Sequence, residues 1–250
     1  MKAFTTFLLV SALSAPAYAQ SLFPDPALEE AVRHYVFEKR NTDEPLTPED
    51  VKDISQVVAR DKGIKDLSGI EHLKRVMLLD LSGNQISDIT PLADLSLLQS
   101  LTLVNNQVSD VSPLEGLTRL QYIELSGNQV RDISALSELK AMSSLYLTGN
   151  QVTDISAVSG MPRLWSLYLE GNQIKDLSPL IGLKGVKRLA LDDNQITDIS
   201  PLIEMAQQDL DGKDRFARYW KVTLDGNSVP SAQVEKLEAL KNAPYKTGSD

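Results

Sequence analysis

Cysteine is absent from this 250-residue chain, so no disulfide can hold its fold and no metal site can use thiolate ligands. Histidine is nearly absent, with only His34 and His72. A metal site would therefore need mainly carboxylate ligands, and a histidine-dependent triad would have to form around one of these two residues. The sequence contains no phosphate-binding loop, H-E-x-x-H, G-x-S-x-G or dinucleotide-binding fingerprint. We therefore expect a protein that is not an enzyme and that binds no metal or cofactor.

Positive charge is in the minority, with 25 Lys and Arg residues against 34 Asp and Glu residues and a formal net charge of -9. Nucleic acids and anionic membrane surfaces attract basic protein faces, so this balance argues against both as partners. After the N-terminal segment, no apolar run approaches the roughly 18 residues of a membrane-spanning helix. We expect no membrane span, and a basic protein remains compatible as a partner.

The first 19 residues have the three parts of a secretory signal peptide. Lys2 supplies positive charge, residues 4–13 are mostly apolar, and Ala17-Tyr18-Ala19 matches the A-x-A cleavage pattern. We expect cleavage after Ala19 and a secreted or periplasmic mature protein. A buried N-terminal helix is the alternative interpretation. Because small exported eukaryotic domains usually carry disulfides, the lack of cysteine favours a bacterial origin.

A 22-residue repeat runs through the middle of the sequence. Six Asn-Gln pairs stand 22 residues apart, and each is followed by Ile or Val. Apolar residues recur eight, five and three positions before each asparagine, so the unit is L-x-x-L-x-L-x-x-N-Q-[IV]-x-D-[ILV]-[ST]. Self-similarity at a fixed period indicates a repeat architecture. The repeated asparagines are Asn84, Asn106, Asn128, Asn150, Asn172 and Asn194.

Each unit has the pattern of one solenoid turn. The alternating x-L-x-L-x stretch predicts a short strand with both aliphatic side chains turned inward. The asparagine amide can bond backbone in its own turn and in the neighbouring turn, which is a structural role. Ser or Thr before Pro, as in Thr90-Pro91, predicts one helical turn with the hydroxyl residue as its N-cap. Stacked units would share one continuous core.

These patterns predict an α/β leucine-rich-repeat solenoid with helical caps. We place the N-terminal cap at 20–56, about eight repeats at 57–229, and a C-terminal capping helix and tail at 230–250. In the cap, Asp25 and Thr47 are predicted to begin helices, with Val51, Ile54 and Val58 turned inward. The step from Asn194 to Asn227 is 33 residues, so we expect an insertion of about 11 residues as a polar loop near 206–218. Ser231 is predicted to cap a helix that covers the last repeat through Val234, Leu237 and Leu240.

The repeat L-x-L-x-x-N-Q-[IV]-x-D-I-S resembles that of the bacterial internalin family. The F-P-D and L-T-P-E-D-V segments of the cap and the imperfect unit G-I-K-D-L-S-G-I-E-H-L extend the resemblance over about residues 23–229. It implies a curved array with a parallel sheet on the concave face, short helical turns on the convex face, and concave-face binding of host or partner proteins. This sequence shows neither the family's usual immunoglobulin-like domain nor a cell-wall sorting motif, which favours a Gram-negative periplasmic or released protein. A regulatory subunit of type-1 protein phosphatase has a similar unit, so binding to an enzyme is an alternative.

An aspartate recurs four positions after each repeated asparagine, beginning with Asp88. Stacked repeats would bring these carboxylates into a ladder about 5 Å apart, which is one arrangement for calcium. The repeat lacks the glycine-rich nonapeptide of calcium-binding β-rolls. We instead expect each aspartate to accept N–H groups at the start of the helical turn.

The variable strand positions, which lie six, four and two residues before each asparagine, should face the concave surface. Ser and Thr dominate them, as on any solvated sheet face, and a purely architectural or envelope-maintenance protein is the alternative this suggests. However, Tyr122, Tyr146 and Tyr168 fall on three consecutive repeats, in the same or adjacent columns. Rows of exposed aromatic residues are typical of interfaces. We expect a monomer that binds a partner protein here.

The remaining expected contacts lie in the C-terminal half of the same face. Trp165 and Trp220, the only two tryptophans, both stand seven residues before their asparagine, with Lys187 between them. The alternative is that both tryptophans pack against neighbouring turns, and for Trp220 this packing is as well supported as a binding role. An acidic rim formed by Glu124, Glu170, Asp192 and Asp225 would favour a basic partner. The predicted partner-binding residues are Tyr122, Glu124, Tyr146, Trp165, Tyr168, Glu170, Arg188 and Trp220.

Overall fold

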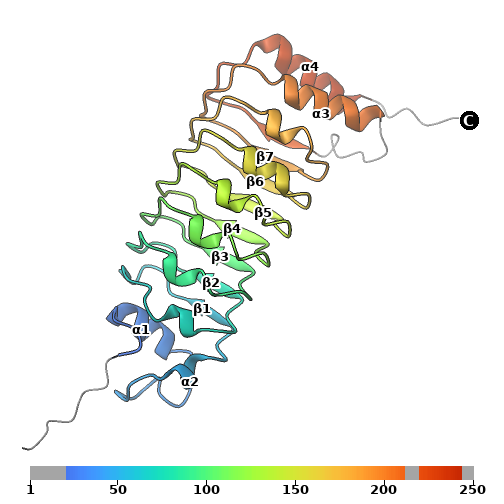
Figure 1. The fold of residues 1–250 in the computed structure, drawn as a ribbon. Coiled ribbons are helices and arrows are strands. Elements are labelled where there is room, and N and C mark those ends of the chain that lie inside the picture. The colour runs from blue at the N-terminus through green and yellow to red at the C-terminus, as the bar shows by residue number, and fades with distance from the viewer. Residues whose placement is uncertain (1–20, 212–219, 244–250) are drawn as a thin grey trace, which may run out of the picture.

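Eight short parallel strands stack in chain order into one sheet, as a computed structural model of residues 21–211 and 220–243 shows (Figure 1). The predicted signal peptide lies outside the described residues. Neighbouring strands pair at equivalent repeat positions, so that Leu79 lies beside Leu101. The strands are β1 Gln56–Val58, β2 Leu78–Asp80, β3 Ser100–Thr102, β4 Tyr122–Glu124, β5 Ser144–Tyr146, β6 Ser166–Tyr168, β7 Arg188–Ala190 and β8 Lys221–Thr223. The predicted leucine-rich-repeat solenoid is therefore confirmed.

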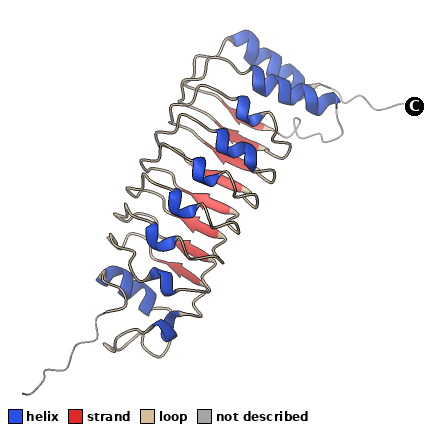
Figure 2. Cartoon of the chain, viewed as in Figure 1, coloured by secondary structure: helices blue, strands red, loops and turns tan. Residues whose placement is uncertain are grey.

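Short 3₁₀ helices form a second layer, drawn as a column of blue turns beside the red strands in Figure 2. They are η1 Ile70–His72, η2 Thr90–Leu92, η3 Ser112–Leu114, η4 Ser134–Leu136, η5 Ser156–Gly160 and η6 Ser178–Leu180. Their N-caps differ from the prediction. The turn η2 begins at Thr90 itself, and the N–H of Thr90 donates to the carboxylate of Asp88 at 2.8 Å. The side-chain acceptor is the repeated aspartate because it reaches the N–H two residues ahead, as in an Asx turn.

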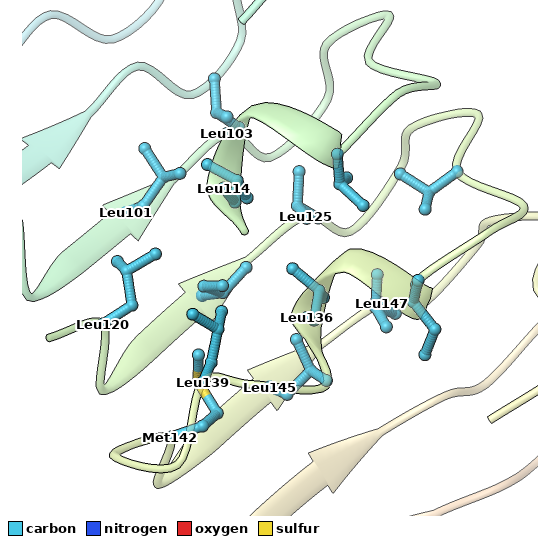
Figure 3. Close-up of a cluster of buried hydrophobic side chains, with 14 of the residues drawn as sticks. Leu101, Leu103, Leu114, Leu120, Leu125, Leu136, Leu139, Met142, Leu145 and Leu147 are labelled. Carbon is cyan, nitrogen blue, oxygen red and sulfur yellow. The ribbon is translucent and has the colours of Figure 1, made fainter. Parts of the chain in front are cut away.

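The core is one continuous cluster that runs the length of the array. Leu145 and Leu147 are both fully buried, which confirms that the paired aliphatic residues of each strand point inward. In Figure 3, leucines from the strand segments and from the helical turns, such as Leu136, point into the same interior. Each repeat thus covers the apolar edge of its neighbour.

The repeated asparagines form a buried ladder along this core. The side-chain amide of Asn128 donates to the carbonyls of Leu125 in its own repeat, at 2.9 Å, and of Leu103 in the preceding repeat, at 2.8 Å. Its Oδ1 accepts the N–H of Val108 at 2.9 Å. The same three kinds of hydrogen bond recur at the other five repeated asparagines. The predicted structural role of the asparagines is confirmed.

The N-terminal cap contains α1 (Pro26–Arg33) and α2 (Pro48–Val51). The carboxylate of Asp25 accepts the N–H of Ala27 at 2.9 Å, so the predicted N-cap of α1 is confirmed. Val58 was expected inside, but α2 ends at Val51 and Val58 belongs to β1, where its side chain is 43% exposed. Strand alternation turns Val58 outward because its neighbour Val57 takes the inward position.

The C-terminal cap contains α3 (Ser200–Asp211) and α4 (Ser231–Asn242), which pack against each other. The prediction of a loop is wrong for residues 206–211, because the helical turn of this repeat continues into the twelve-residue α3. Residues 212–219 lie outside the described part of the chain. Leu237 is buried in α4 as expected, whereas Val234 is 37% exposed and does not cover the last repeat. None of the described helices has the length and hydrophobicity that a membrane crossing requires.

Candidate protein-binding face

The concave face is formed by the outward side chains of the strands, which align into columns across the sheet. The first strand residues form one column and the third strand residues form another, because all pairs are in register. The central residue of each strand points into the core. Side chains one repeat apart are about 4.8 Å from each other at the backbone, so large residues in one column must touch.

Three tyrosines of this face form a tyrosine stack, defined as Tyr122 on β4, Tyr146 on β5 and Tyr168 on β6. Tyr146 and Tyr168 are adjacent in the third-residue column, and their rings stack at 4.7 Å with an interplanar angle of 18°. Tyr122 reaches the stack from the first-residue column, with its ring centroid 5.3 Å from that of Tyr146. All three side chains are half-buried. Ring packing fixes their rotamers in advance, so little side-chain entropy would be lost on binding.

The hydroxyl of Tyr122 stays protonated and uncharged over the physiological pH range. Burial, together with the nearby carboxylate of Glu124, raises the pKa of the Tyr122 hydroxyl to about 12. The phenol therefore remains a hydrogen-bond donor beside an apolar ring surface, which is the combination that favours tyrosine at interfaces.

The two tryptophans, expected to act alike, differ completely. Trp165 is 47% exposed, and the ammonium of Lys187 lies 4.3 Å from its ring centroid. Trp220 is only 2% exposed and belongs to the core cluster. Its predicted role as an anchor is therefore wrong. At the C-terminal end of the array a large apolar ring is more stable inside than on the surface, since burial of an aromatic side chain contributes about 2–3 kcal/mol.

The predicted acidic rim is partly engaged within the protein. Glu170 accepts a hydrogen bond from the hydroxyl of Thr148 at 2.7 Å, and Glu124 accepts the N–H of Ser126 at 3.0 Å. Asp192 accepts the N–H of Asp225 at 2.7 Å and the hydroxyl of Thr223. Because these carboxylates already accept hydrogen bonds within the protein, they are less available to a basic partner than free carboxylates would be.

A shallow hollow on the C-terminal part of this face was not predicted. It has a volume of about 310 Å³ and is lined by Tyr168, Arg188, Leu189, Ala190, Lys221 and Thr223. Arg188 was among the expected contact residues, but Lys221 was not. The signal available in the sequence was the alanine at position 190, which interrupts a column of larger side chains.

The N-terminal end of the concave face has a different character. Arg60 forms an ion pair with Asp80 on β2. Burial acts to raise the pKa of Asp80, but the hydrogen bonds from Arg60 and Ser82 outweigh it and leave this pKa lowered. Val58, which pairs with Asp80 in the sheet, and Met77, just before β2, are each 43% exposed. No partner-binding residue was predicted at this end of the face.

The repeated aspartates bind backbone in the described residues. Asp110, for example, accepts the N–H of Ser112 at 2.8 Å, and the other five make the equivalent bond. Their predicted role at the start of the helical turns is confirmed. In residues 21–211 and 220–243, no group of three or more His, Cys, Asp or Glu side chains is arranged to hold a metal ion.

Comparison with known proteins relates the repeats to a family. A model described as leucine-rich repeats (two copies) matches residues 78–116, 96–138, 118–160, 140–182 and 162–204. Together these overlapping matches cover half of the chain. Among curated protein sequences, no significant match was found.

Solved structures extend the likeness to the whole array. The chain is 32% identical to an internalin C2 from Listeria monocytogenes, with a TM-score of 0.63, and the match covers 81% of this chain and 94% of that one. The functional domain of InlJ from Listeria monocytogenes, which includes a cysteine ladder, shares 17% identity and a TM-score of 0.50 over 87% and 54% of the two chains. The plant peptide hormone receptor RGFR1 in complex with RGF2 shares 20% identity and a TM-score of 0.53 over 64% and 26%. The last two show the fold alone. From its repeats and its likeness to internalin C2, the chain belongs to the leucine-rich-repeat family and is an internalin-like bacterial protein.

Proposed function

We propose that this protein is an exported binding module that holds a partner protein on its concave face. The observation that carries the proposal is the tyrosine stack, in which three aromatic rings meet on the solvent side of adjacent strands. Aromatic residues in ordered, partly buried positions are the usual centres of protein interfaces. Trp165, just before β6, adds a further exposed aromatic ring, since nearly half of it is exposed.

The scaffold supports a rigid mode of binding. The strands that carry Tyr146 and Tyr168 are held from below by the continuous core and from the side by their neighbours. A partner would therefore dock on a surface that is already formed, and the free energy of binding would not be spent on folding it. No catalytic residue is part of this proposal.

The test is the effect of single alanine substitutions on the binding of a partner isolated from periplasm or host-cell extract and then purified. Tyr146→Ala and Tyr168→Ala should each weaken binding by about 2 kcal/mol or more, as expected of central aromatic contacts. Ser100→Ala, on the same face but outside the stack, is the matched control and should be nearly neutral. Equal dissociation constants for all three folded variants would move the binding site to the convex turns or the cap.

Export is the second part of the proposal. The A-x-A pattern at Ala17 and Ala19 supports cleavage that leaves Gln20 as the first residue. Intact-mass analysis of protein recovered from periplasm or medium should give the mass of residues 20–250. Recovery of only the uncleaved chain, in the cytosol, would contradict this proposal.

A further inference from the structure

The C-terminal hollow owes its shape to Ala190. This residue follows Tyr146 and Tyr168 in the third-residue column, and Thr223 follows it in turn. One face of the Tyr168 ring stacks on Tyr146, and the step from a phenol to a methyl group leaves open space on the other side. The hollow of about 310 Å³ thus has an aromatic wall at Tyr168 and a small, buried floor at Ala190.

Two cations stand side by side at the same hollow. Arg188 on β7 and Lys221 on β8 are directly paired in the sheet, so their backbones are about 4.8 Å apart. Like charges opposite each other on neighbouring strands destabilise a sheet. Both side chains are exposed, and within residues 21–211 and 220–243 neither forms an ion pair. An anion placed between them would relieve the repulsion.

The contrast with the nearby carboxylates indicates that the ligand carries a negative charge. Asp192 and Glu170 already accept hydrogen bonds from Thr223 and Thr148, whereas the side-chain donors of Arg188 and Lys221 are not used within the described residues. A third cation, Lys187, lies over Trp165 at the adjoining edge. In a chain with a net charge of -9, this edge is a local concentration of positive charge.

We propose that the hollow binds the carboxylate of an aspartate or glutamate side chain of the partner protein. The guanidinium of Arg188 can bind a carboxylate through two parallel hydrogen bonds, and Lys221 adds a charged donor beside it. The aromatic wall at Tyr168 takes an apolar side chain next to that acid in the partner. The recognised segment is therefore acidic and apolar, which differs from the basic partner that the acidic rim favours. This inference rests on the proposed function and names the chemistry that the concave face selects.

Peptide display against the intact mature protein tests the proposal without knowledge of the partner. A random peptide library is selected on the wild-type protein, on Arg188→Glu/Lys221→Glu, and on Arg119→Glu/Lys175→Glu. The last variant reverses two exposed cations outside the concave strands and so matches the change in net charge. Wild-type and control should enrich peptides with Asp or Glu beside an aromatic or aliphatic residue. Arg188→Glu/Lys221→Glu, called the hollow variant because it changes the cations of the hollow, should lose this enrichment.

The dissociation constant of a single enriched peptide then measures how much the two cations contribute to binding. The peptide should bind Arg188→Glu/Lys221→Glu about tenfold or more weakly than it binds the wild type. A form of the peptide in which Gln replaces the acidic residue should bind the wild type equally weakly. Enrichment of basic peptides, no enrichment at all, or acidic peptides that bind the hollow variant unchanged would each overturn the proposal. Peptides that depend on Tyr146 and Tyr168 but not on Arg188 and Lys221 would overturn the carboxylate site alone. Peptides that depend on neither pair would contradict the concave-face function as well.

Discussion

The buried asparagines connect successive turns of backbone just beyond the strands, in addition to backbone hydrogen bonds such as that from the Gln129 N–H to the Val108 carbonyl. Each leucine carbonyl at the end of a strand accepts two amide donors. The carbonyl of Leu103, for example, accepts from Asn106 at 3.1 Å and from Asn128 at 2.8 Å. The N–H of Val108 has a single acceptor, the Oδ1 of Asn128. Loss of one asparagine therefore leaves the carbonyls satisfied but deprives one buried N–H of its partner.

Asn128→Ala should lower the free energy of unfolding by about 2 kcal/mol, because an unsatisfied buried N–H costs roughly 1–3 kcal/mol. The adjacent Gln129 is exposed, and Gln129→Ala should change stability by less than about 0.5 kcal/mol. Urea titration followed by circular dichroism measures both. Equal stability of the two variants would mean that the ladder does not hold the turns together.

The short helical turns differ from one repeat to the next although their sequences are similar. The turn η5 extends over five residues and ends at Gly160, whereas η3 and η6 have three residues each. A Cβ built on Gly160 would lie 2.1 Å from the carbonyl oxygen of Ser137 in the preceding repeat. At the equivalent Gly182, a Cβ would meet nothing within 4 Å. The same position is thus tightly packed in one repeat and open in the next.

Gly160→Ala should destabilise the protein by about 1–3 kcal/mol, because the added methyl group forces the two turns apart. Gly182→Ala is the matched control, with the same change at the same repeat position, and should lie within about 0.5 kcal/mol of the wild type. Thermal unfolding monitored by calorimetry compares the two. A fully stable Gly160→Ala variant would show that η5 can shift away from Ser137 at no cost.

At the scale of the whole molecule, every repeat depends on its two neighbours for a buried core. Leu147 lies in the middle of the array and is completely buried. In a stack of this kind stability is approximately the sum of the repeats and of the interfaces between them. A defect in a central repeat therefore removes two interfaces, and it separates the capped ends from each other.

Leu147→Asp should unfold the central repeats, because an unpaired charge in the core costs about 3–5 kcal/mol. Ser144→Asp introduces the same charge on the outward side of β5 and should leave the melting temperature nearly unchanged. Hydrogen exchange should show protection lost on both sides of β5 in the first variant alone. Wild-type melting of Leu147→Asp would refute the inward assignment of this residue.

The sequence by itself determined the repeat register, the inward leucines, the asparagine ladder and the helix that begins after Asp25. These features depend on spacing that recurs in every unit, and the local pattern specifies them because each unit meets the same kind of neighbour. The tyrosine stack was also predictable, since the strand register placed Tyr146 and Tyr168 side by side.

The tertiary structure alone decided the features that depend on where a repeat lies in the array. Trp165 and Trp220 occupy the same repeat position, but Trp165 is exposed just before β6 and Trp220 is buried at the capped end of the array. Likewise, the hollow exists only because Tyr168, Ala190 and Lys221 come together from the three neighbouring strands β6, β7 and β8. A periodic pattern carries no information about such differences, because burial and charge pairing are set by neighbours a full repeat away.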